Sequence, residues 1–217
     1  MSEEQGRTTE TDQEMGSDIQ RAATILRQAS EHARQQLTYR YPVLFTTWGL
    51  MYLLGYGVLW LSVLGQHPYV GPTSMALLSL TLIVAAAMAI TVVLIGRAVS
   101  GIGGASARQR RVCALASLVG FAGLFTLEAA LAHAGASFAV LGVYGAAAPL
   151  LLTGVFCALG AALAQNWTAL ALGVWLVAVA AGSGFGGPVT VWAVDALASS
   201  AGFLAVAVVR LRQRRDR

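Results

Sequence analysis

The sequence predicts an all-α integral membrane protein with six transmembrane helices, both termini on the cytoplasmic side, and a cytoplasmic amphipathic helix before the first span. Three observations lead to this prediction. The 217 residues are 57% hydrophobic and only 11% charged, which is typical of polytopic membrane proteins. Several apolar segments approach or exceed the roughly 20 residues that cross a bilayer. All 14 basic residues are arginines, in three clusters that a six-span chain places on one side.

The N-terminal 41 residues divide into two segments. Residues 1–16 are acidic and contain almost no large apolar side chain, so we expect them to be disordered. Within residues 17–41, a Ser-x-x-Gln capping box predicts a helix start, and Ile19, Leu26 and Leu37 belong to an apolar stripe with helical spacing. This amphipathic helix lies on the inner leaflet, pairs with a partner or a second copy of the chain, or only leads into the first span.

Residues 42–209 form the predicted membrane domain, and residues 210–217 form a basic cytoplasmic tail. The four arginines of the Arg97–Arg111 loop stand in contrast to the loops near Gly65 and Gly135, which contain none. Because basic residues near span ends stay in the cytoplasm, this loop and both termini are predicted to be cytoplasmic. The absence of lysine and the abundance of Ala, Gly, Val and Leu indicate a GC-rich bacterial source, so we expect the bacterial cytoplasmic (inner) membrane. The six predicted spans cover residues 43–64, 74–96, 112–134, 138–164, 167–182 and 189–209.

An internal repeat is one hypothesis for the first and third hairpins. When the sequence is shifted onto itself, Gly57, Gly71 and Pro72 align with Gly173 and with the Gly187–Pro188 pair. Duplication of hairpins is common in membrane bundles. Chance identity among frequent residue types is the alternative explanation.

Two acidic residues lie within predicted spans, Glu128 in the third and Asp195 in the sixth, at similar depth below the external surface. Asp195 and Ser199 share a face of small and polar residues that we expect to point into the bundle. Tyr144 reaches a similar depth in the fourth span and can donate a hydrogen bond. If the acids meet, they would share a proton and bind a cation or couple transport to protons. Alternatively, each is simply protonated, or hydrated near the interface, and hydrogen-bonded to backbone.

No catalytic, metal or nucleotide motif is present, so the prediction is a protein without enzymatic activity, cofactor or metal. Ser183 lies in a glycine-rich segment similar to that of intramembrane serine proteases, but no histidine follows His133 to act as a base. We expect Cys113 and Cys157 to be small buried hydrophobes rather than a reactive pair. The net charge of +4 reflects membrane orientation and not a nucleic-acid surface. The expected partner is the lipid bilayer.

The leading functional hypothesis is an accessory or regulatory membrane component that docks a cytoplasmic or membrane partner, or a second copy of the chain. The alternative is a small proton- or cation-coupled transporter, or a permease subunit, that uses the intramembrane acids. For docking, the accessible cytoplasmic side chains are Ile19, Leu26, Leu37, Arg97, Arg108, Arg110 and Arg111.

A cytoplasmic amphipathic helix followed by six spans resembles the membrane half of type 2 ABC exporters. The resemblance is one of topology alone. The loop between the fifth and sixth spans has about seven residues, where that family has re-entrant helices, so the resemblance implies no residue roles.

Overall fold

The computed structural model describes Thr24, residues 41–99 and residues 105–215, and it assigns helices but no strand to them. The chain divides into two units, residues 1–40 and 41–217. The first unit is described only at Thr24, which is helical. The predicted acidic segment and the amphipathic helix with Ile19, Leu26 and Leu37 therefore lie outside the described residues.

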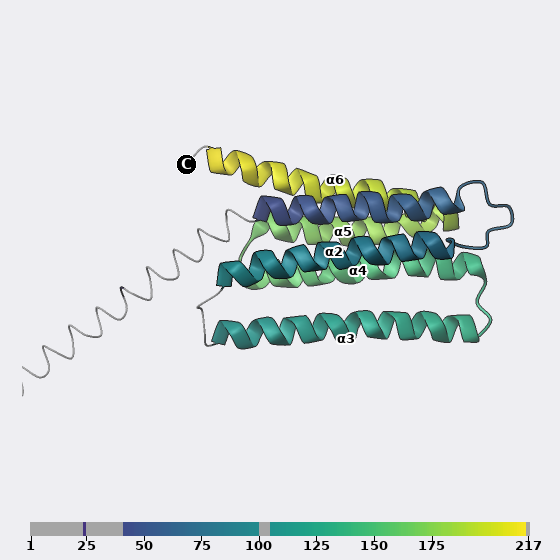
Figure 1. Ribbon diagram of the computed structural model, residues 1–217, viewed down its shortest axis with the longest axis horizontal. Helices are drawn as coiled ribbons and strands as arrows, with labels where there is room; N and C mark the ends of the chain where they lie inside the picture. The colour runs from purple at the N-terminus through teal and green to yellow at the C-terminus, as the bar shows by residue number, and fades with distance from the viewer. Residues whose placement is uncertain (1–23, 25–40, 100–104, 216–217) are drawn as a thin grey trace, which may run out of the picture. The chain divides into compact units, whose positions relative to one another are not determined.

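Five helical segments in the described residues are long and apolar enough to cross a membrane: Tyr41–Val63, Ser74–Leu94, Val112–His133, Phe138–Leu163 and Trp167–Gln213. They confirm the all-α fold and indicate a multi-pass membrane protein. After the Tyr41–Val63 helix, the elements in chain order are α2 (Ser74–Val99), α3 (Ala105–His133), α4 (Phe138–Leu163), α5 (Trp167–Ser183), a 3-10 turn (Gly184–Gly186) and α6 (Gly187–Arg215) (Figure 1).

The fifth candidate segment folds back on itself as the α5–α6 hairpin. Trp175 of α5 donates a hydrogen bond from Nε1 to the carbonyl oxygen of Ala198 in α6, at 2.9 Å. Further along α6, Gly202 packs against Trp175 and Leu172. Earlier residues of α5 thus face later residues of α6, so the two helices are antiparallel. The chain reverses at Gly187, whose φ of 85° is favourable for glycine.

Helix α5 packs closely on α4 because two glycines lie at their interface. A Cβ added to Gly173 would lie 2.5 Å from the backbone nitrogen of Ala158, and one added to Gly154 would lie 2.9 Å from the carbonyl oxygen of Gly173. Small residues let membrane helices approach in this way. Among α2 to α6, α4, α5 and α6 contact one another, whereas α3 contacts α4 alone (Figure 1).

The Tyr41–Val63 helix packs against α6 and α2. Tyr52 stacks on Phe203 of α6 with ring centroids 5.4 Å apart. Trp48 donates from Nε1 to the Thr91 hydroxyl of α2 at 3.1 Å, and the Leu80 side chain of α2 packs on Gly55. The core therefore lies among the Tyr41–Val63 helix, α4, α5 and α6, and α2 adds Ala76 and Ala87 to it. Its largest fully buried apolar side chains are Leu59, Val63, Leu150, Leu176 and Val191.

The non-helical connection between α2 and α3 is shorter than the predicted Arg97–Arg111 loop, although the candidate spans on either side end at Leu94 and begin at Val112. Helix α2 continues to Val99 and α3 begins at Ala105, so only residues 100–104 lie between them. Arginine and alanine favour the helix, and charge ends the membrane-spanning part of a helix without ending the helix itself.

Candidate functional site

Asp195 and Ser199 lie one helical turn apart in the core of the bundle. Both side chains are 0% exposed, as the small and polar face of α6 predicted. Within the described residues, neither carboxyl oxygen of Asp195 nor the Ser199 hydroxyl has a hydrogen-bond partner. A buried carboxylate without a partner is strongly unfavourable, so this group needs a proton or a cation.

Other buried polar side chains belong to the interior of the bundle. Tyr52 and Tyr56 of the Tyr41–Val63 helix are buried, as is Ser183 at the end of α5. The Ser183 hydroxyl donates to the carbonyl oxygen of Ala180 at 3.3 Å. Among the described residues, no basic side chain forms an ion pair with Asp195.

Trp192 and Tyr69 close this core toward the loop that joins the Tyr41–Val63 helix to α2. Trp192 lies one turn before Asp195 on α6, and its ring contacts Tyr56 at a centroid distance of 5.7 Å. Trp192 Nε1 donates to the Tyr69 hydroxyl at 3.2 Å. Burial raises the pKa of the Tyr69 phenol, and the hydrogen bond from Trp192 opposes this shift. The phenol therefore stays protonated at neutral pH and retains its own proton for donation.

The loop that carries Tyr69 is held in place by Gln66 and by a glycine of α4. Gln66 Oε1 accepts from the backbone nitrogens of Val70 at 3.0 Å and Gly71 at 3.2 Å, and Gln66 Nε2 donates to the Gly71 carbonyl at 3.0 Å. The Tyr69 ring occupies the space beside Gly142, where an added Cβ would lie 2.8 Å from Cζ. Tyr69 thereby enters the bundle from a loop.

Glu128 lies in a separate cavity of about 170 Å³, which we call the Glu128 cavity. The carboxylate of this half-buried residue is placed against Gly145 of α4, whose added Cβ would lie 3.0 Å from Oε1. The lining residues are Tyr69, Val70, Gly71, Pro72, Leu77, Glu128, Phe138, Leu141, Gly142, Gly145 and Trp192.

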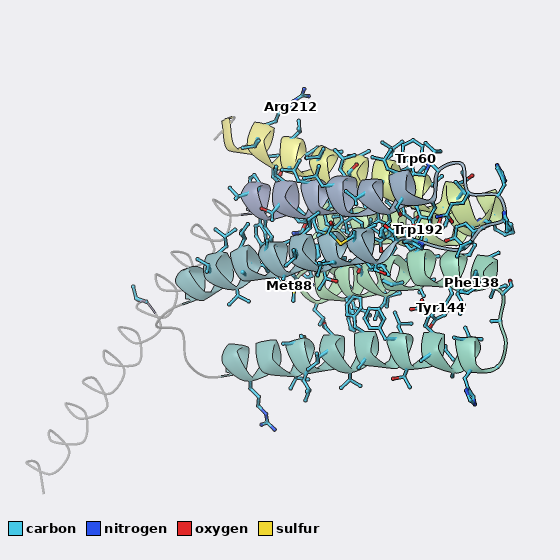
Figure 2. The ribbon with its side chains drawn as sticks, turned by 45° about the vertical axis from the view of Figure 1, so that its right-hand side comes forward. Trp60, Met88, Phe138, Tyr144, Trp192 and Arg212 are labelled. Carbon is cyan, nitrogen blue, oxygen red and sulfur yellow. The ribbon has the colours of Figure 1, made fainter. Side chains whose placement is uncertain are left out.

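The four residues predicted for one polar site fall into two places. Asp195 and Ser199 lie in the core, whereas Glu128 and Tyr144 lie where α3 meets α4. The Tyr144 hydroxyl donates to the carbonyl oxygen of Leu124 in α3 at 3.2 Å, and its side chain points toward α3 (Figure 2). Helices α3 and α6 do not touch in the described part of the chain. Trp192 connects the two places, because it lines the Glu128 cavity and lies one turn from Asp195.

The predicted docking residues are described only in part. Arg97 lies in α2, and Arg108, Arg110 and Arg111 lie in the first turns of α3. Of these four arginines, the structure describes the side chain of Arg108, which is exposed.

The expectation of two buried cysteines is wrong for one of them. Cys113 is exposed and Cys157 is half-buried, and both are free. The difference arises because α3 presents most of its surface outward: no residue of the window that qualifies it as a span is buried, whereas Cys157 of α4 packs against the core.

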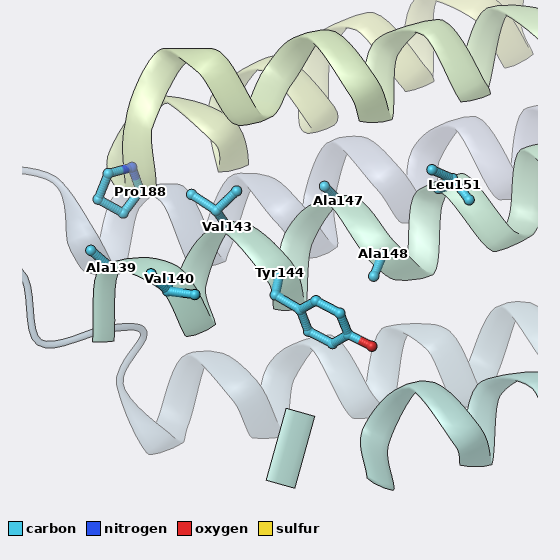
Figure 3. A pocket seen from close by; sticks show the side chains of 8 residues that line it. All are labelled: Ala139, Val140, Val143, Tyr144, Ala147, Ala148, Leu151 and Pro188. Carbon is cyan, nitrogen blue, oxygen red and sulfur yellow. The ribbon is translucent and has the colours of Figure 1, made fainter. Parts of the chain in front are cut away.

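A larger, open groove of about 560 Å³ runs along α4 (Figure 3). Among the described residues that line it, Tyr144 alone has a polar side-chain group and none is charged, so the groove offers an apolar surface. Its lining residues are Ala139, Val140, Val143, Tyr144, Ala147, Ala148, Leu151 and Pro188.

Comparison with known proteins adds no further site residue. No family model, no curated protein and no solved structure matches this chain. Among the described residues, no group of three His, Cys, Asp or Glu side chains could hold a metal ion.

Proposed function

We propose that the chain crosses the cytoplasmic membrane of a bacterium six times, with both termini in the cytoplasm. The antiparallel pairing of α5 and α6 supports two crossings within Trp167–Gln213. The arginines at the α2–α3 connection and at the end of α6 support the orientation. Single cysteines introduced as His67→Cys and Gln213→Cys in a cysteine-free variant test it. An impermeant thiol reagent should label position 67 in intact cells and position 213 only after permeabilisation; the reverse pattern would contradict the proposed orientation.

For function, we propose a small transporter coupled to protons or cations, without enzymatic activity, in which Asp195 binds the coupling ion. The observation that carries this proposal is the fully buried Asp195 carboxyl group without a partner among the described residues. A carboxyl group in such a place destabilises the fold least when it is neutral or paired with a cation. Intramembrane acids of this kind commonly serve as ion or proton sites.

The neighbours of Asp195 suit this exchange. The Ser199 hydroxyl is buried and unpaired in the described residues, so it is available to bond a carboxylic acid or to bind a cation together with the carboxylate. Tyr52 and Tyr56 of the Tyr41–Val63 helix are buried in the same core. A small relative movement of the Tyr41–Val63 helix and α6 would then change the affinity for the ion.

Proton flux into vesicles tests this function. Purified protein is reconstituted with a pH-sensitive dye inside, and a potassium gradient with valinomycin drives protons inward. We expect flux above that of protein-free vesicles, and Asp195→Asn should abolish it. Ser200→Ala is the matched control, since the Ser200 hydroxyl is nearly buried but bonds the carbonyl oxygen of Leu197 in its own helix at 2.9 Å. Equal flux in Asp195→Asn and wild type would refute the assignment.

Docking of a partner remains a second candidate, supported by helix α3. None of the residues in the apolar stretch that makes α3 a candidate span is buried. Among α2 to α6, α3 contacts α4 alone. A helix with so little contact within its chain leaves faces for a membrane or cytoplasmic partner, or for a second copy. Deleting residues 17–38 should abolish co-purification of such a partner without preventing insertion, and unchanged co-purification would exclude docking through that segment.

A further inference from the structure

The Glu128 cavity has a single sign of charge. Glu128 is the one acidic residue among its 11 lining residues, and none of these residues is basic. No ion pair involving Glu128 is present in the described part of the chain. A cavity of this kind attracts a cation, because a partly buried carboxylate gains most from an opposite charge within a few ångströms.

The cavity offers few oxygen atoms besides the Glu128 carboxylate. The Tyr69 hydroxyl already accepts a hydrogen bond from Trp192, and the Gly71 carbonyl accepts one from Gln66. Magnesium and calcium need about six to eight oxygen ligands. The remaining side chains are apolar or aromatic, so a hard metal ion would lose more hydration than this cavity replaces.

Aromatic side chains, rather than oxygen ligands, make up much of the cavity wall. Tyr69, Phe138 and Trp192 come from the loop, α4 and α6, and all three line the cavity. Trp192 and Phe138 both lie toward the end of the bundle where α4 begins (Figure 2). Aromatic faces attract organic cations, above all quaternary ammonium groups, and the apolar walls favour the alkyl groups that such ions carry.

We propose that the Glu128 cavity binds a small organic cation, a quaternary or protonated amine, with Glu128 as the counter-ion and the three aromatic residues as walls. Its volume of about 170 Å³ is well below the roughly 300–1,000 Å³ of pockets for drug-sized ligands, so the ligand has only a few carbon atoms. The binding stands on the cavity alone. The further role of this cation as the transported substrate, exchanged against the ion at Asp195, rests on the proposed transport function.

Equilibrium binding of radiolabelled tetramethylammonium to the purified full chain in detergent tests the site. We expect saturable binding of the probe to the wild type. Glu128→Gln should weaken this binding by roughly tenfold or more, because it removes the negative charge that attracts the cation in a cavity shielded from water on one side. Trp192→Leu should weaken it by roughly three- to tenfold through loss of an aromatic wall. Ser200→Ala is the control: the Ser200 hydroxyl bonds the carbonyl oxygen of Leu197 in its own helix and Ser200 does not line the cavity, so the affinity should be unchanged.

Three results would overturn the proposal. One is that the wild type shows no saturable binding, and another is that Glu128→Gln binds the probe with the same affinity as the wild type. The third is that sodium or calcium displaces the labelled probe at concentrations where unlabelled tetramethylammonium does not. If Glu128→Gln fails to fold, Phe138→Leu takes its place: Phe138 is largely exposed at the start of α4, and this variant should lower the affinity by roughly threefold, while an unchanged affinity would count against the site. Binding without proton flux would refute transport and leave the cation site standing, whereas flux without binding would refute the cation site.

Discussion

Replacing Gly173 with alanine tests the closest helix contact of the bundle. The added Cβ would lie 2.5 Å from the nitrogen of Ala158 and 2.8 Å from its Cα. These are backbone atoms of α4, so no side chain can rotate away. Ordinary contact between such atoms requires about 3.5 Å, and α4 and α5 must therefore separate locally by roughly 1 Å.

The expected loss of stability follows from two opposing terms. Overpacking of a well-packed interior costs typically about 1–3 kcal/mol, and the strain belongs at the upper end because the contact is with backbone. Alanine in place of glycine favours the helix by about 1 kcal/mol. We therefore expect Gly173→Ala to destabilise the protein by about 2 kcal/mol, which corresponds to a fall of roughly 4–8 °C in Tm for a chain of this size.

Gly182→Ala is the matched control, because Gly182 lies on the same helix and a Cβ added there meets nothing within 4 Å. Helix propensity alone then predicts no loss, or a gain of up to about 1 kcal/mol. Thermal unfolding in detergent, followed by tryptophan fluorescence, measures both variants. Equal Tm values for Gly173→Ala and Gly182→Ala would refute the close α4–α5 contact.

The same unfolding assay checks three further predictions. Asp195→Asn should leave Tm unchanged or raise it, because it replaces a buried ionisable group whose oxygens have no hydrogen-bond partner in the described core; a loss above about 2 kcal/mol would assign Asp195 a structural role. Tyr69→Phe should cost about 1 kcal/mol by leaving the Trp192 N–H without its acceptor, and an unchanged Tm would contradict that bond. Asn166→Ala should cost about 2 kcal/mol, since Asn166 caps α5 and accepts from Arg210; a loss as small as that of an exposed substitution would argue against both contacts.

Hydropathy predicted the helix ends well where turn residues interrupt apolar segments. The fourth span was predicted at residues 138–164 and α4 covers Phe138–Leu163, because Ser137 caps its start and Gln165, with a φ of 51°, ends it. Gly71 and Gly187, aligned in the suggested repeat, both adopt positive φ before a proline, at 102° and 85°. Turn chemistry is local, so the sequence carries it directly.

The arrangement of the helices was beyond hydropathy, because every span is apolar whether it faces lipid or protein. The most apolar stretch of α3 has a mean hydropathy of 1.8, and none of its residues is buried. The most apolar stretch of Trp167–Gln213 has the same mean hydropathy, but 33% of its residues are buried. In a membrane, helix partners are chosen by close packing of small residues and not by apolarity. Here Gly154 of α4 and Gly173 of α5 allow the two helices to pack closely. Which glycines meet depends on how the helices lie in space, and hydropathy does not contain that information.

The candidate site was predictable along one helix and not between helices. The face shared by Asp195 and Ser199 followed from four-residue spacing, and both side chains are buried. Tyr69 and Trp192 were not singled out, although Trp192 precedes Asp195 by three residues on a related face. The position of Tyr69 depends on the space left by Gly142, which has no side chain, and on the hydrogen bonds of Gln66. Neither contact can be predicted from the sequence around Tyr69.

Trp192 determines how a cation in the Glu128 cavity could act on Asp195. In the described part of the chain α3 and α6 do not touch, so no helix contact there lets Glu128 act on Asp195 directly. Trp192 lines the cavity, bonds Tyr69 and packs on Tyr56, and it lies one helical turn before Asp195 on α6. A ligand that displaces the Trp192 ring therefore disturbs the Tyr69 bond and the packing beside Asp195 together. Coupling requires that ligand and ion each favour one of two arrangements, and Trp192 is the side chain through which both can do so.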